Sequence, residues 1–107
     1  MSMTPVQRFR RAIQSLFSHL GMEAEYWPAD GTPPYDIAVI AKQPDRLYEA
    51  GEALLHGEDI QFEFMVADVL VPQRGDDIHF NDEIYRIDAE PLLEQHQLVW
   101  RAAMIKL

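Results

Sequence analysis

The spacing of apolar residues changes at Gly21 from the period of a helix to the period of a strand, which limits the chain to few architectures. Thr4, Pro5 and Gln7 form a capping box with proline at the first helical position, so a helix is predicted over residues 4–20. Its apolar stripe consists of Val6, Phe9, Ile13, Leu16, Phe17 and Leu20. A stripe of this size predicts that the helix packs on the rest of the protein.

The segments that follow alternate apolar and polar residues and are separated by turn residues. Strands are predicted over residues 22–27 and 35–41, with Asp30-Gly31 as part of the turn between them. The clearest strand spans residues 59–66, and one of its faces carries Ile60, Phe62, Phe64 and Val66.

The last segment, residues 98–107, is predicted to be a strand that is apolar on both faces. Leu98, Trp100 and Met104 lie on one side, and Val99, Ala103 and Ile105 lie on the other. Such a strand is covered on both faces, either by the N-terminal helix or by another subunit. We expect a single domain over residues 1–107, mainly β with an N-terminal α-helix, whose residues 22–107 form a small antiparallel β-barrel or sandwich.

A long irregular excursion, residues 42–58, interrupts the strands. Pro44, Gly51 and Gly57 punctuate it, and it has no sustained hydrophobic period. Its apolar side chains are Leu47, Tyr48, Leu54 and Leu55. These side chains either fold back on the domain or meet a partner, so we expect residues 44–57 to be poorly ordered in the free subunit and protected on assembly.

The stretch from residue 71 to residue 88 contains Arg74-Gly75-Asp76, which is either an adhesion signal or the turn that starts a hairpin. Matching of apolar residues favours a hairpin with a four-residue connection, residues 81–84. Phe80 would then lie opposite Tyr85 and Ile78 opposite Ile87, which places these four residues in the core of the hairpin. Its outer face would carry Asp77, His79, Arg86 and Asp88, with Arg86 across from His79.

Several kinds of site are absent from the sequence. The chain has no cysteine, so it has no disulfide, thiolate nucleophile or cysteine-ligated zinc, and this favours a reducing cytoplasm over secretion and adhesion. No apolar run is long enough for a membrane span, and arginines interrupt the N-terminal apolar residues. The acidic residues between 76 and 83 lack the spacing of a calcium loop. We therefore predict no catalytic residue, no metal site and no cofactor.

The charge is unevenly distributed along the chain. Residues 1–20 carry a net charge of +3, and residues 21–107 carry all 18 acidic residues and a net charge of −12. The acidic part repels nucleic-acid phosphates, so specific DNA binding is not expected. An alternative from a different class is a soluble inhibitor that imitates DNA with its carboxylates.

The order of these elements resembles the small head-to-tail joining (head completion) proteins of long-tailed phages and prophages, the lambda-type attachment family. The resemblance extends over nearly the whole chain. It rests on the following features: Pro44, Tyr48, Gly51 and Gly57 in the excursion, the alternating strand of residues 60–66, the turn Arg74-Gly75-Asp76 before a hairpin that contains Tyr85, and the final strand with Trp100.

The resemblance implies a structural protein of the virion neck, made in the host cytoplasm, that joins the portal side of a DNA-filled head to the tail. It also implies a ring of identical copies on assembly, a free subunit that can be a monomer, and portal or connector and tail proteins as partners, with DNA passing through the ring. A phage tail terminator or completion protein is the alternative within the same role. The candidate subunit or portal interface comprises Arg8, Arg11, Pro44, Leu47, Tyr48, Leu54, Leu55, Trp100 and Met104.

Overall fold

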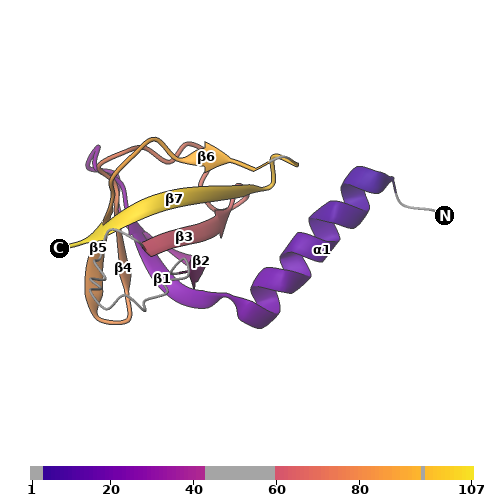
Figure 1. The fold of residues 1–107 in the computed structure, drawn as a ribbon, viewed down its shortest axis with the longest axis horizontal. Coiled ribbons are helices and arrows are strands. Elements are labelled where there is room, and N and C mark those ends of the chain that lie inside the picture. The colour runs from indigo at the N-terminus through magenta and orange to yellow at the C-terminus, as the bar shows by residue number, and fades with distance from the viewer. Residues whose placement is uncertain (1–3, 43–59, 95) are drawn as a thin grey trace, which may run out of the picture.

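The computed structural model describes residues 4–42, 60–94 and 96–107 and shows a small antiparallel barrel from which one helix projects (Figure 1). The elements are α1 (Pro5–Leu20), β1 (Met22–Trp27), β2 (Tyr35–Lys42), β3 (Ile60–Met65), β4 (Asp77–Phe80), β5 (Glu83–Ile87), β6 (Leu92–Leu93) and β7 (Val99–Lys106). The predicted fold class, mainly β with an N-terminal helix, is confirmed, and the barrel form is chosen over the sandwich.

Six strands close the barrel in the order β3-β2-β1-β4-β5-β7, and pairing of β3 with β7 completes the ring. The inward faces of these strands supply a core without exposed area. Its largest side chains are Tyr26, Val39, Phe62, Phe64, Ile78, Ile87 and Met104. The alternating face predicted for the third strand enters this core at Ile60, Phe62 and Phe64, whereas Val66 lies beyond the strand in a turn.

Two ion pairs of Glu63 link β3 to its two neighbouring strands, β2 and β7, on the outside of the barrel. Glu63 of β3 lies 3.3 Å from Lys42 Nζ of β2 and 3.4 Å from Arg101 Nε of β7. The carboxylate is only 9% exposed, so both cations compensate the loss of its hydration.

Strand β7 pairs with β3 and β5 in the barrel and also with the short strand β6. Ala102 and Met104 are fully buried in the barrel, while Ala103 and Ile105 on the other face stay partly exposed. The sequence patterns did not predict β6, whose Leu92 and Leu93 pair with the start of β7. The sequence left two covers open for the outer face of β7, the N-terminal helix or another subunit. The helix packs mainly against β2 and not against β7.

The hairpin of β4 and β5 has a different register from the predicted one. Its loop has two residues, Asn81 and Asp82, with φ angles of 56° and 66°, and Phe80 lies opposite Glu83. Asparagine and aspartate tolerate positive φ, so turn chemistry decided the register and the prediction from apolar matching was wrong. A shift of two residues leaves every side chain on its face. Ile78 and Ile87 are therefore buried, and Phe80 and Tyr85 pack against the core.

Helix α1 begins as predicted, but it does not pack as predicted. Thr4 accepts from the Gln7 N–H and Gln7 Oε1 accepts from the Thr4 N–H, which completes the capping box. Phe17 is the only buried residue of α1. Four apolar residues remain 40% to 59% exposed, namely Val6, Phe9, Leu16 and Leu20. Helical spacing identifies an apolar face but does not say what covers it, and within the described residues the barrel covers little of it.

Gly21 joins α1 directly to β1 in a space that admits no side chain. Its N–H donates to the Phe17 carbonyl at 2.9 Å, and its backbone is extended, with φ −72° and ψ 150°. A Cβ at this position would lie 2.5 Å from that carbonyl oxygen and 3.2 Å from Ala38 Cβ. Glycine is required here for close approach and not for a left-handed turn.

Replacing Gly21 by alanine is therefore expected to lower the free energy of unfolding by about 1–3 kcal/mol, because the backbone of α1 must move to admit the methyl group. Urea denaturation followed by circular dichroism measures the loss. Ser18→Ala, at an exposed position of the same helix, serves as the control and should be close to wild type. Equal stability of the two variants would contradict this account of the junction.

Candidate functional site

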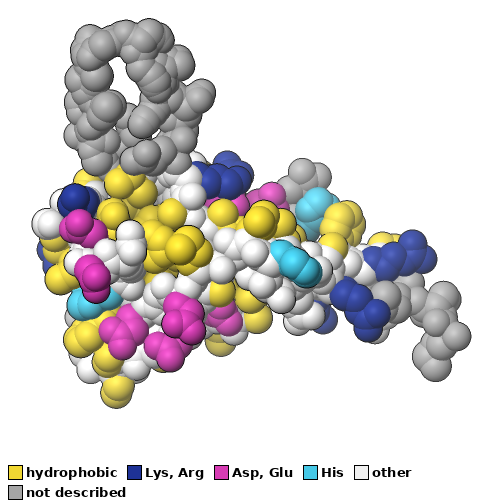
Figure 2. All heavy atoms as spheres, turned by 90° about the horizontal axis from the view of Figure 1, so that it is seen from below, with side chains coloured by type: hydrophobic (Ala, Val, Ile, Leu, Met, Phe, Trp, Pro, Cys, Tyr) yellow, Lys and Arg dark blue, Asp and Glu magenta, His cyan; other side chains and the backbone are white. Residues whose placement is uncertain are grey.

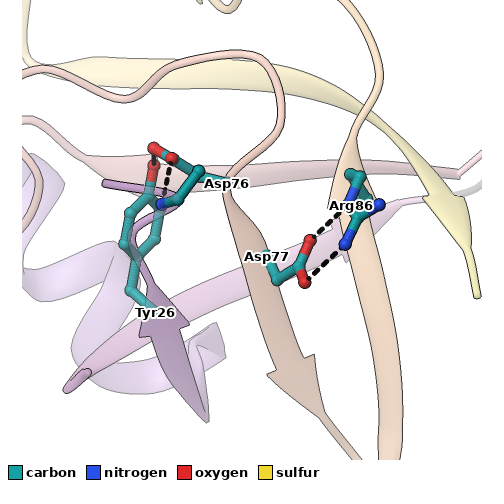
Figure 3. A network of polar contacts seen from close by, with 5 residues as sticks. Tyr26, Asp76, Asp77 and Arg86 are labelled. Carbon is teal, nitrogen blue, oxygen red and sulfur yellow. Dashed lines mark hydrogen bonds and ion pairs between the residues drawn. The ribbon is translucent and has the colours of Figure 1, made fainter. Parts of the chain in front are cut away.

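The Arg-Gly-Asp turn is a structural joint in which Asp76 is buried, Gly75 is half-buried and Arg74 is exposed. Gly75 has a φ of 98°, which glycine adopts without strain, and its N–H continues the hairpin ladder to the Ile87 carbonyl at 2.9 Å. Asp76 is only 5% exposed and accepts three hydrogen bonds, from the Tyr26 hydroxyl, the Ala29 N–H (2.8 Å) and the Gln73 N–H (3.0 Å) (Figure 3). An adhesion receptor needs an accessible aspartate, so the adhesion interpretation fails in this structure.

The two neighbouring aspartates have opposite environments (Figure 3). Burial, followed by the hydrogen bond to Asp76, raises the pKa of Tyr26 far above its usual range, so its hydroxyl keeps the donated proton. Asp77 points to the outer face and accepts from Arg86 Nε at 2.8 Å and from Nη2 at 3.1 Å. This bidentate bond raises the pKa of the Arg86 guanidinium. Arg86 therefore pairs across the hairpin with Asp77, and the predicted pairing with His79 is wrong.

An acidic hollow of about 520 Å³ opens where β1 and the β4–β5 hairpin separate. Strand β1 pairs with β4 only from Glu25 to Trp27, so its first residues leave the hairpin tip free. The carboxylates around the hollow are Glu23, Glu25, Asp36, Asp82 and Glu83, and its apolar lining is Ala24, Phe80 and Ile84. The Trp27 and His79 rings stack beside it with their centroids 4.7 Å apart. We call this surface the acidic hollow.

A second surface lies beside the turn that Asp76 holds. Leu70 and Val71 are 73% and 70% exposed, and they border an opening of about 470 Å³ together with Tyr35. Burial raises the pKa of Tyr35, and the nearby Asp76 and Asp68 carboxylates add to that effect. Two adjacent aliphatic side chains with this exposure are suited to contact another protein.

The structure places the sequence-derived interface residues in different surroundings. Arg8 and Arg11 are exposed on α1, and Trp100 is half-buried with its Nε1 donating to the Val69 carbonyl at 2.9 Å. Met104 has no exposed area, so it is a core residue and not a surface for a neighbour, contrary to the prediction. The remaining candidates, Pro44, Leu47, Tyr48, Leu54 and Leu55, lie outside the described residues, as does the predicted ordering of residues 44–57.

The sequence analysis did not identify the acidic hollow or the pair Leu70 and Val71. The alternation of Glu23 and Glu25 with inward residues was a usable signal for the hollow, because it places both carboxylates on the outer face of β1. Their approach to Asp82 and Glu83 depends on the two-residue hairpin loop, which apolar matching did not predict.

Metal-binding side chains are not gathered in the part of the chain that is described. Across residues 4–42, 60–94 and 96–107, no group of three or more His, Asp or Glu side chains could hold a metal ion. No helix among these residues is long and apolar enough to cross a membrane.

Comparison with known proteins identifies the family of the chain. A search of curated proteins found no match to this chain. The sequence model of a family described as Phage Head-Tail Attachment protein matches residues 6–104, from the first turn of α1 into the final strand β7. That range includes the helix, the Arg-Gly-Asp joint, the acidic hollow and all strands of the barrel, so the chain belongs to the phage head-tail attachment family.

Proposed function

We propose that this protein is a non-catalytic adaptor of the virion neck, which joins the portal side of a DNA-filled head to the tail as a ring of identical copies. The observation that carries the proposal is the family match over residues 6–104. The exposed apolar side chains of α1 and of the pair Leu70 and Val71 support it, since such side chains are suited to protein contacts.

The charge distribution supports a role beside moving DNA. The chain carries a net charge of −9, and its lysines and arginines are partly neutralised, as at Arg86 and Lys106. DNA phosphates are held mainly by free Lys and Arg side chains, so carboxylates along a channel would let DNA pass without being retained. In this proposal the subunit is made in the host cytoplasm and is recruited to the neck from there.

Deletion of the gene from its phage or prophage tests the proposal. We expect DNA-filled heads and separate tails of normal length to accumulate, because each part is complete and only the connection is missing. Adding the purified full-length protein to that extract should restore tailed particles, counted by electron microscopy and by infectivity.

Two other results would contradict a joining role. Tails of irregular length in the deletion extract would indicate a tail terminator. Normal joining of heads to tails in the deletion extract, together with inhibition of a DNA-processing enzyme by the purified protein, would indicate a soluble inhibitor that imitates DNA.

A further inference from the structure

Helix α1 leaves much of its apolar stripe exposed, although the Phe9 ring on that stripe contacts the His96 ring. Phe9 and Leu16 are 44% and 40% exposed on it, although helix burial normally removes such side chains from water. A gap of about 50 Å³ between α1 and the barrel, beside Ile13 and Leu98, indicates loose packing on the covered side.

The same helix carries positive charge without local compensation. It contains three arginines and no acidic residue. In the described part of the chain, neither Arg8 nor Arg11 belongs to any of the four ion pairs. Helical spacing places Arg8 and Arg11 on the side of α1 away from its apolar stripe, and this basic side suits an acidic surface.

The acidic hollow is a surface of that kind. Five acidic residues line it, and its lining also includes Ile84, which is 40% exposed. None of the described residues that line it is a lysine or an arginine. Within the described residues, the carboxylates of Glu23, Asp36 and Asp82 take part in no ion pair.

One copy cannot bring these two surfaces together. Figure 1 shows the N-terminal half of α1 pointing away from the barrel, on the side opposite the β4–β5 hairpin. Figure 2 shows acidic side chains gathered on the barrel and basic side chains at the far end of the helix, both on the same face of the molecule. Complementary patches at opposite ends of a subunit favour a head-to-tail contact between copies, which closes into a ring when the rotation allows it.

We infer that α1 of one copy docks in the acidic hollow of the next copy, with its basic side, which carries Arg8 and Arg11, toward the carboxylates. This inference rests on the proposed function, because it assigns the contact that builds the proposed ring. Pairing of two α1 helices is disfavoured, since it would gather six arginines with no acidic residue on either helix to neutralise them.

Two charge-reversed variants test the contact in the joining assay described above. The helix variant carries Arg8→Glu and Arg11→Glu, and the hollow variant carries Glu23→Arg and Asp36→Arg. Each variant alone is expected to lose at least about tenfold in joining activity, because attraction becomes repulsion at several pairs of charges. An equal mixture should recover most of the activity, since the reversed helix of one copy fits the reversed hollow of the other.

The matched control reverses two exposed acids outside the hollow, Asp88→Arg and Glu90→Arg, and should join heads to tails like wild type. Recovery in the mixture also shows that both variants are folded. Full activity of the hollow variant alone would overturn the contact and leave the joining function intact. Failure of the wild-type protein to join heads to tails would instead overturn the proposed function.

The absence of cysteine allows a direct second measurement. Ser15→Cys labels α1, and Asp82→Cys labels the hairpin tip. A short bis-maleimide cross-linker added to joined particles should link the two proteins only when both are present in the mixture. Cross-linking of Ser15→Cys subunits to each other, without mixed products, would show a helix-to-helix contact and overturn the inference.

Discussion

Replacing Asp76 by alanine is expected to lower the free energy of unfolding by about 3–5 kcal/mol. The carboxylate is 5% exposed and accepts from three donors on three segments, the Tyr26 hydroxyl, the Ala29 N–H and the Gln73 N–H. Alanine leaves all three donors without this acceptor in a place that water scarcely reaches, and each lost bond to a charged group costs about 1.5–3 kcal/mol in the cases where nothing replaces it. Urea denaturation at neutral pH measures the change.

The adjacent residue provides the matched control. Asp77→Ala removes the same side chain one position later, where the carboxylate faces outward and pairs with an exposed arginine. Exposed ion pairs contribute little, so this variant should lose much less stability than Asp76→Ala. Tyr26→Phe removes one of the three donors and should cost about 1 kcal/mol. Equal losses at Asp76 and Asp77 would show that the buried joint does not stabilise the turn.

The sequence predicts the elements of this fold well because their signals are local. The capping box at Thr4 and Gln7 begins the helix, and the alternation in residues 60–65 defines a barrel strand. Both signals depend on residues within a few positions of one another, where backbone geometry alone sets the pattern. The closed barrel then follows from several short strands that must bury one face each.

Burial and register depend on residues that are distant in the sequence, and there the sequence was a weaker guide. Alternation shows that Asp76 and Asp77 point to opposite faces. It does not show that the hydroxyl of Tyr26, fifty residues earlier, donates a hydrogen bond to Asp76. The same limit explains why Met104 was assigned to an interface although β3 and β5 enclose it. It also explains why the apolar face of α1 was expected to be covered.

The acidic hollow depends on strand pairing, which the composition of the chain does not reveal. The strongly acidic charge of the chain was evident from its sequence, but the hollow depends on where β1 and β4 stop pairing and on a two-residue loop at the hairpin tip. Arg8 and Arg11 were identified as interface candidates from the charge contrast alone. The structure adds a surface of opposite charge, which is the surface that the inferred contact between copies uses.

Replacing Phe62 by alanine is expected to lower the free energy of unfolding by about 3–5 kcal/mol, the usual range for a large aromatic side chain removed from a core. Phe62 is 1% exposed, and its ring centroid lies 5.5 Å from that of Phe80 and 5.0 Å from that of Tyr85. Its partners on the neighbouring strands are Ala41 and Ala102, which are too small to fill the space that the ring leaves. The cavity should therefore persist, and thermal denaturation should show a large fall in the melting temperature.

Phe9→Ala is the same substitution on the exposed face of α1, and it separates stability from assembly. The Phe9 ring is 44% exposed and contacts the His96 ring, with centroids 4.0 Å apart, so its removal should change the melting temperature far less than Phe62→Ala does. The barrel core stabilises each subunit, whereas the exposed apolar stripe of α1 should act only when the subunit meets another protein. Phe9→Ala should therefore weaken joining of heads to tails while leaving the barrel folded. A large loss of stability with normal joining would show instead that this face of the helix belongs to the core.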